Sequence, residues 1–345
     1  MIKIDGKIGY GQVLRTSIAL STLTGKPVKI FNIRVNRPNP GLAAQHLTSV
    51  KVAAEFCNAE VKGLKLGSLE IEFFPKEIDL PSKKRIDIGT AGNIGLFLQT
   101  LFPILLFGDK EVELEIKGGT AGLGAPPIEF LIHVLFPILE KMGVKKPLIE
   151  IERYGFYPKG GGLVRIKTFP IKSLKSLKLV ERGSLKKIEG ISVVGSLPED
   201  IAKRQAASAK KILMKAGFNS EIKSKVVNTF SPGTFISLWA IFENTVLGND
   251  ALGEKGKPAE KVGEEVALGL LESIRSNACL DKFLSDQIIP FLVLAKGKSE
   301  VKIEKFTDHV MTNLKVCEMF FEEIFEIDEE NRIIKVNGIG FEGKI

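Results

Sequence analysis

A weak internal repeat constrains the fold of this chain more than any other feature of its sequence. In the first copy, an apolar helical pattern at 12–24 ends at Gly25, as a C-cap glycine would end a helix. An apolar strand at 28–33, a loop and a second helical pattern at 45–57 follow. The pattern therefore predicts one unit in which strands and helices alternate.

The same order of elements returns twice more. In the second copy the first helix ends at Gly108, the strand lies at 112–116 and the second helix at 127–142. In the third copy the corresponding elements are expected at 283–295, 301–303 and 311–321. The third copy begins later than the spacing of the first two predicts, which implies an inserted segment before it.

The inserted segment is expected at 182–262. It contains strand patterns at 188–194, 220–227 and 234–243 and an amphipathic helix at 200–216, and a helix at 258–277 returns the chain. We therefore expect an α+β fold of α/β-type repeats, with a large domain at 1–181 and 263–345 and a smaller inserted α/β domain at 182–262.

The charge balance is compatible with an anionic partner. The 345 residues include 49 Lys and Arg against 41 Asp and Glu, a formal net charge of +8. Such a surplus suits RNA, but it is also common in proteins that bind no nucleic acid.

The three cysteines are scattered and none forms a CxxC pair, which argues against a disulfide framework or a zinc site. Cys57 and Cys317 lie on apolar helical patterns and are expected in the core. The apolar stretch at 94–107 is too short to span a bilayer, and the first residues lack a signal-peptide pattern. We expect a cytoplasmic protein without a membrane partner.

Three loops, at 34–45, 120–127 and 306–312, occupy equivalent positions in the copies and are expected to line one cleft. Of the three histidines, His133 lies in an apolar helix and is expected to be buried and structural. His46 begins a helix, where a surface or binding role is favoured over catalysis. His309 sits in a polar loop whose neighbours can fix its tautomer, so a nucleophilic role and an ordinary loop position are equally open.

Several polar features point to phosphate without proving it. Arg34 and Arg37 suit phosphate oxygens, although solvated charges at a strand end are an equal alternative. The glycine turns at 9–12 and 158–162 can bring N–H groups close to phosphate, and neither is a Walker A loop or a dinucleotide fingerprint. The acidic residues near glycine turns that can hold magnesium are Asp5, Asp87, Glu129 and Asp286, and residue type does not decide among them.

The segment at 154–162, with its Gly-x-x-Pro-x-Gly-Gly-Gly core, resembles the signature of RNA 3'-terminal phosphate cyclases. Further segments agree with this family in the same order: 5–6, 12–15, 33–42, 45–48, 118–127, 283–287 and the region of His309. The resemblance covers essentially the whole chain. It implies three βαβαββ-like units, similar to those of enolpyruvyl transferases, with a smaller α/β domain inserted before the third.

The resemblance also implies an activity. Family members convert an RNA 3'-phosphate to a 2',3'-cyclic phosphate, consume ATP with a divalent cation, and release AMP and pyrophosphate. His309 matches the nucleophile that carries AMP before the RNA is adenylated. The positions that match residues around ATP or near phosphates are Gln99, Pro126, Phe283, Leu284, Ser285, Asp286, Gln287, Arg15, Arg34 and Arg37.

Two departures concern the metal and the nucleotide. Bacterial and animal members usually carry a metal-binding Glu in a longer glycine turn, whereas the turn at 9–12 has no carboxylate, so the ligands of Mg²⁺ or Mn²⁺ stay unknown. At Phe283 a tyrosine is more usual, which removes a hydroxyl and keeps a ring. The physiological RNA, the role of the inserted domain and the oligomeric state are left open.

A non-catalytic relative acting in ribosome assembly or RNA binding is the main alternative. Such relatives lack the catalytic histidine, which this chain retains at His309, while the missing Glu keeps the alternative open. A transferase acting on a small phosphorylated metabolite rests on fold analogy alone.

Overall fold

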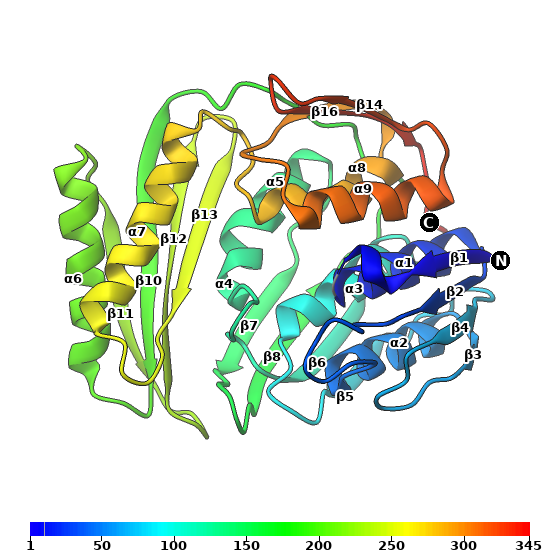
Figure 1. Ribbon diagram of the computed structural model, residues 1–345, viewed down its shortest axis with the longest axis horizontal. Coiled ribbons are helices and arrows are strands. Elements are labelled where there is room, and N and C mark those ends of the chain that lie inside the picture. The colour runs from blue at the N-terminus through cyan, green and yellow to red at the C-terminus, as the bar shows by residue number, and fades with distance from the viewer. Residues whose placement is uncertain (10) are drawn as a thin grey trace.

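The computed structural model describes residues 1–9 and 11–345, so part of the glycine turn expected at 9–12 lies outside the described residues. The fold is mixed α+β and contains four sheets of four strands each (Figure 1). In three of them the strand order is first, second, fourth, third along the chain. The first two strands of each are parallel and the other pairs antiparallel.

These three sheets take their strands from successive parts of the chain. The first sheet contains β1 (Ile2–Asp5), β2 (Val28–Phe31), β3 (Glu60–Lys62) and β4 (Ile71–Phe74). The second contains β5 (Lys83–Asp87), β6 (Val112–Gly118), β7 (Leu148–Arg153) and β8 (Gly162–Thr168). The third contains β9 (Lys178–Leu179), β14 (Lys296–Lys302), β15 (Phe325–Asp328) and β16 (Ile333–Ile339).

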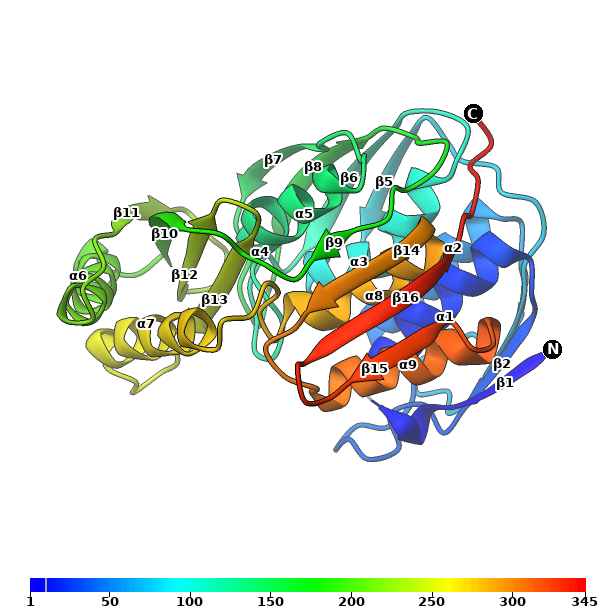
Figure 2. The same ribbon diagram turned by 90° about the horizontal axis from the view of Figure 1, so that it is seen from above.

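The helices of these units pack against one another and against the sheets, in one large hydrophobic core (Figure 2). They are α1 (Gly11–Thr24), α2 (Ala44–Phe56), α3 (Ile94–Leu106), α8 (Leu284–Leu294) and α9 (Asp308–Phe320), with a 3₁₀ turn η1 at Gly6–Ile8. The helix expected at 127–142 is a run of α4 (Ile128–Phe130), a π segment η2 (Leu131–Leu135) and α5 (Phe136–Lys141).

One helix start differs from the sequence prediction in a way that matters for function. The third-copy helix was expected from 311, but α9 begins at Asp308, so His309 lies in its first turn and not in a loop. The reason is a cap: the Thr307 hydroxyl oxygen accepts a hydrogen bond from the Val310 N–H and starts the helix earlier.

The fourth sheet belongs to the inserted segment. It contains β10 (Leu185–Gly195), β11 (Glu221–Val227), β12 (Gly233–Phe242) and β13 (Val246–Leu252), of which β13 was not expected. Helices α6 (Glu199–Lys215) and α7 (Ala259–Arg275) pack on it and share a hydrophobic cluster of their own with its strands. The boundary expected at 262 therefore falls inside α7, which continues to pack on this sheet beyond that residue.

The remaining expectations from composition concern the cysteines and the membrane. Cys57, Cys279 and Cys317 are free and buried, so the prediction that Cys57 and Cys317 are core residues is confirmed. Across the described ranges, no helix combines the length and the apolar character needed to cross a membrane.

Candidate active site

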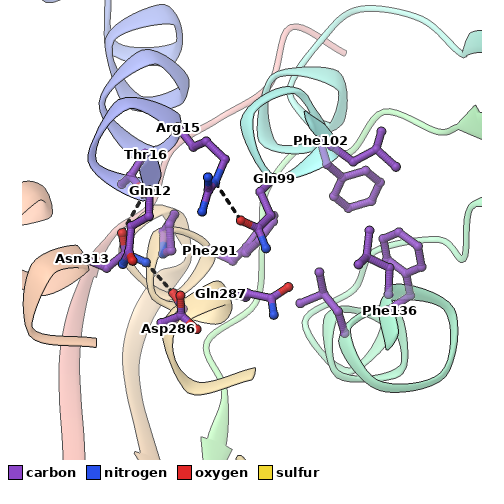
Figure 3. Close-up of a pocket in the computed structure, with 14 residues that line it drawn as sticks. Gln12, Arg15, Thr16, Gln99, Phe102, Phe136, Asp286, Gln287, Phe291 and Asn313 are labelled. Carbon is purple, nitrogen blue, oxygen red and sulfur yellow. Dashed lines mark hydrogen bonds between the residues drawn. The ribbon is translucent and has the colours of Figure 1, made fainter. Parts of the chain in front are cut away.

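The first turns of α8 and α9, with residues of α1 and α3, border a pocket of about 380 Å³ that reaches the inserted sheet. His309, Arg15, Gln99, Pro126, Phe283, Asp286 and Gln287 all line it. A neighbouring cavity of about 30 Å³ shares Arg15, Gln99, Asp286 and Gln287 with it (Figure 3). The structure therefore brings seven of the sequence-predicted site residues together from three of the four sheet units.

The other predicted residues lie outside this lining. Leu284 and Ser285 are buried in the first turn of α8, where the Ser285 hydroxyl donates to the Asp281 carbonyl at 2.6 Å. Arg34 donates to the Gly41 carbonyl at 2.7 Å. Burial lowers the pKa of Arg34, and the positive charge of Arg37 lowers it further. Arg37 is close enough to His309 for its charge to lower the pKa of that imidazole.

His309 is held by Gln12, a buried side chain of α1. The Gln12 amide nitrogen donates to the His309 carbonyl oxygen at 2.5 Å, and the Gln12 amide oxygen pairs with Nδ1 of the imidazole. An amide oxygen can only accept, so this pairing requires a proton on Nδ1 and leaves the lone pair on Nε2. The tautomer is thus the one that a nitrogen nucleophile at Nε2 needs.

The charge state of His309 follows from its surroundings. Desolvation lowers its pKa, Arg15 and Arg37 lower it further, and Asp308 opposes them. The imidazole is therefore neutral at neutral pH, which a nucleophile requires.

Arg15 and Asp286 both line the pocket, and their charges influence each other. Burial lowers the pKa of Arg15 to about 10, with Asp286 acting in the opposite direction. Burial raises the pKa of Asp286 to about 7, and Arg15 counteracts that rise. The Arg15 Nε also donates to the Gln99 amide oxygen at 2.9 Å, which fixes the guanidinium toward the pocket (Figure 3).

A polar chain ties the three helices of the site together. The Thr16 hydroxyl donates to Asn313 Oδ1 at 2.7 Å, and Asn313 Nδ2 donates to the Asp286 carbonyl at 2.7 Å (Figure 3). No side-chain role was expected for Gln12 or Thr16, and Asn313 was expected only as one of the polar neighbours that can fix the His309 tautomer. A spacing in the sequence could have indicated these residues. Gln12 and Thr16 on α1 are four residues apart, as are His309 and Asn313 on α9, so each pair places two polar side chains on one face of its helix.

The inserted sheet also contributes to the pocket, which the sequence analysis did not foresee. The pocket is lined on this side by Asp250 and Leu252 of β13, by Lys257 and by Glu265 of α7. Burial raises the pKa of Asp250 to about 7, and the nearby Asp281 and Glu129 carboxyl groups raise it further. The pocket is thus formed between the repeat units and the insert.

The candidate metal ligands lie apart from one another. Asp5 accepts from the Lys7 N–H at 2.9 Å, Asp87 pairs with Lys117 at 2.8 Å, and Glu129 accepts from the Tyr154 hydroxyl at 2.6 Å. Asp286 is the one of the four that lines the pocket. Within the described part of the chain, no three His, Cys, Asp or Glu side chains are grouped to hold a metal ion.

The glycine-rich signature is used for close backbone packing. A Cβ on Gly155 would lie 2.3 Å from the Gly162 nitrogen and 2.5 Å from the Gly118 carbonyl oxygen. The N–H groups of Lys159 and Gly160 already donate to Ser231 Oγ and the Phe156 carbonyl. Two donors of the expected phosphate cradle at 158–162 are therefore occupied.

The other two histidines have different surroundings. His46 is buried, so of its two expected roles the surface one is wrong and the binding one stays a prediction. The reason is that α2 packs its first turn against α1, where a Cβ on Gly11 would lie 2.3 Å from His46 Nε2. Burial lowers the pKa of His46 to about 3. His133 is only partly buried and stacks on Trp239 of the insert, with ring centroids 3.9 Å apart. Its expected full burial is therefore wrong, because the ring lies where the second unit meets the insert, and its structural role stays a prediction.

Comparison with known proteins gives a consistent result. The family model described as RNA 3'-terminal phosphate cyclase matches residues 7–327. A protein of Pyrococcus furiosus named RNA 3'-terminal phosphate cyclase is 45% identical over 347 residues, covering 100% of this chain and 98% of its own. Proteins of that name from Ignicoccus hospitalis and Pyrobaculum aerophilum are 44% and 42% identical, each covering at least 98% of both chains.

Proposed function

The chain belongs to the RNA 3'-terminal phosphate cyclase family, and we propose that it converts an RNA 3'-phosphate to a 2',3'-cyclic phosphate with consumption of ATP. The observation that carries the proposal is His309, a neutral imidazole oriented by Gln12 at the rim of a pocket that also contains Arg15. A free phosphate monoester is a poor electrophile with no good leaving group, so activation by nucleotidyl transfer is the chemical task.

In the first step, His309 Nε2 attacks the α-phosphorus of ATP. A P–N bond forms, the bond to the bridging oxygen breaks, and pyrophosphate leaves. Arg15 lies in the same pocket, and its charge favours the added negative charge of the pentavalent transition state. We assign Arg34 and Arg37 to the phosphates on the outer side, since their charges lie close to the site without lining the pocket.

In the second step, an oxygen of the RNA 3'-phosphate attacks the phosphorus of the histidine-bound AMP and releases His309. The RNA then carries a phosphoanhydride. The neighbouring 2'-hydroxyl attacks the RNA phosphate, loses its proton and expels AMP. This last step is intramolecular, so holding the ribose and the phosphate in line supplies much of the acceleration.

We propose that the nucleoside of ATP occupies the pocket between α8, Pro126 and the insert. Phe283 gives a ring surface, and Gln99, Asp286 and Gln287 give polar groups. Leu284 and Ser285 would act through the position of the α8 first turn, because both side chains are buried. We propose that Mg²⁺ or Mn²⁺ accompanies ATP and takes its ligands mainly from the phosphates, with Asp286 as the candidate carboxylate that lines the pocket.

The fold supports the same assignment. We propose that the three sheets of equal strand order are three βαβαββ units, similar to those of enolpyruvyl transferases. The insert between β9 and α8 is then a separate small domain from about 182 to 275, a limit supported by the cluster that α7 shares with the inserted sheet.

The test is covalent labelling with ATP that carries its label on the α-phosphate, in Mg²⁺ or Mn²⁺. We expect an acid-labile, alkali-stable adduct in the wild type and in His133→Ala, and none in His309→Ala. His133 is the matched control because it stacks on Trp239 and does not line the pocket. Absence of label in the wild type with either metal would refute the enzymatic mechanism and favour a non-catalytic RNA-binding role.

A further inference from the structure

Two large aromatic side chains stand in solvent where the signature segment meets the insert. Tyr157, between β7 and β8, is 80% exposed, and Phe230, between β11 and β12, is 53% exposed. The two connections touch: the Lys159 N–H donates to Ser231 Oγ at 3.0 Å, and a Cβ on Gly161 would lie 2.2 Å from the Phe230 ring. The β7–β8 and β11–β12 connections lie beside each other at the lower edge of Figure 1.

One cation contacts the Phe230 ring, and two more lie on the neighbouring segments. The Arg153 guanidinium lies 4.5 Å from the Phe230 ring centroid and is anchored by a 2.6 Å hydrogen bond from its Nε to the Gly161 carbonyl. The Lys225 ammonium lies 5.0 Å from the centroid of Tyr154, and Lys159 is exposed. Within residues 1–9 and 11–345, none of these three cations forms an ion pair with a carboxylate.

Parts of other charged surfaces carry ion pairs. On the outer face of the second sheet, Lys83 pairs with Glu113 and Arg165 pairs with Glu115. On α6, Arg204 pairs with Asp200. Cations without acidic partners beside exposed rings leave both charge and aromatic surface available to a polyanion with flat bases.

The same place is connected to the active-site pocket through one small core. Ala121, Phe156 and Phe235 form a hydrophobic cluster against which Leu252 packs. Leu252 also lines the pocket that contains His309, together with the loop that follows Ala121. The segment that carries Tyr157 and the pocket are therefore connected through this cluster.

We propose that Arg153, Tyr157, Lys159, Lys225 and Phe230, here named the stacking patch, bind the single-stranded RNA that precedes the reacting 3' end. The bases stack on the rings and on the Arg153 guanidinium plane, and the lysines meet the phosphates. A duplex cannot offer its base faces in this way. The proposal rests on the proposed function, since it places the body of the RNA whose end reacts at His309.

The test compares the KM for a 3'-phosphorylated dinucleotide with that for a single strand of about ten nucleotides, a length that covers a typical single-strand site. In the wild type the longer RNA should have the lower KM. In the double variant Tyr157→Ala, Phe230→Ala the KM for the longer RNA should rise at least about fivefold, because removing each ring weakens binding of the base that stacks on it. The KM for the dinucleotide and the labelling of His309 by ATP should not change.

Several controls separate stacking from folding and from charge. Tyr157→Phe with Phe230→Tyr keeps both rings and should restore the wild-type KM. Lys159→Ala with Lys225→Ala should reduce the dependence of affinity on log salt by roughly 0.7 for each RNA phosphate that a lysine no longer neutralises. Lys211→Ala and Met214→Ala, on the exposed face of α6, should leave RNA binding unchanged.

The outcomes distinguish the two proposals. Unchanged KM for the longer RNA in the double variant, or equally tight binding of a strand with abasic sites in place of its bases, would overturn the stacking patch. An equal loss for the dinucleotide and for labelling by ATP would make the role structural and also overturn it. A wild type that is never labelled by ATP would instead refute the proposed function.

Discussion

Replacing Gln12 tests whether the orientation of His309 controls the first chemical step. Gln12 makes two hydrogen bonds to His309, one to the carbonyl and one to Nδ1. Each contributes about 0.5–1.5 kcal/mol net, so Gln12→Ala should cost about 1–3 kcal/mol of transition-state stabilisation. The rate of His309 adenylylation should then fall roughly 5- to 150-fold.

A second substitution at this position separates geometry from charge. In Gln12→Glu, a carboxylate beside Nδ1 stabilises the imidazolium and should raise the His309 pKa above that of the wild type. Because the wild-type pKa lies below its usual value of 6.5, the wild-type rate should be level above about pH 6.5 and fall only at lower pH. In the Glu variant this fall should begin at a higher pH than in the wild type, and the rate should recover as the pH is raised.

The assay is single-turnover formation of the labelled protein at saturating ATP over a range of pH. Thr16→Val is the control, because Thr16 lies one helical turn from Gln12 on α1 and its hydroxyl donates to Asn313. Two results would show that Gln12 does not set the tautomer of His309. One is an adenylylation rate of Gln12→Ala within twofold of the wild type, and the other is a pH dependence of the Glu variant that is not shifted to higher pH.

Two further predictions follow from buried and stacked groups. Burial raises the pKa of Asp250 from 3.8 to about 7, so between these pH values the folded state binds more protons than the unfolded state and the free energy of unfolding falls as the pH rises. Asp250→Asn should lessen that fall by up to about 4 kcal/mol, measured by urea unfolding at pH 4 and pH 8. An equal fall in the wild type and the variant would contradict this prediction. Trp239 is the single tryptophan and stacks on His133, and burial lowers the pKa of His133 to about 4. The fluorescence of the indole should therefore change with a midpoint near pH 4, and this change should be lost in His133→Ala. An unchanged titration in that variant would exclude the stack as its cause.

Most helices could be predicted from the sequence because their cause is local. The apolar periodicity and the stop at Gly25 predicted α1, and the same kind of pattern predicted α3 and α8, to within a few residues. The start of α9 was missed because Thr307 was not recognised as its cap. Short strands such as β3 and β13 were missed because three to seven residues carry little pattern and their pairing partners lie elsewhere in the chain.

The candidate site divides in the same way. The motifs indicated Arg15, Gln99, Phe283, Asp286 and His309 through resemblance, and the structure places all of them around one pocket. Neither the burial of His46 nor the contribution of Asp250 could be read from spacing, since each depends on which helix or sheet packs against it.

The sequence by itself determined the repeat, the position of the insertion, the family and the residue types available for nucleotidyl transfer. These follow from periodicity and motifs, which are properties of neighbouring residues. Only the tertiary structure decided that Gln12 from α1 holds His309 on α9, and that the insert closes one side of the pocket. The physical reason is that burial and pairing arise between segments far apart in the chain, where no local pattern records the partner.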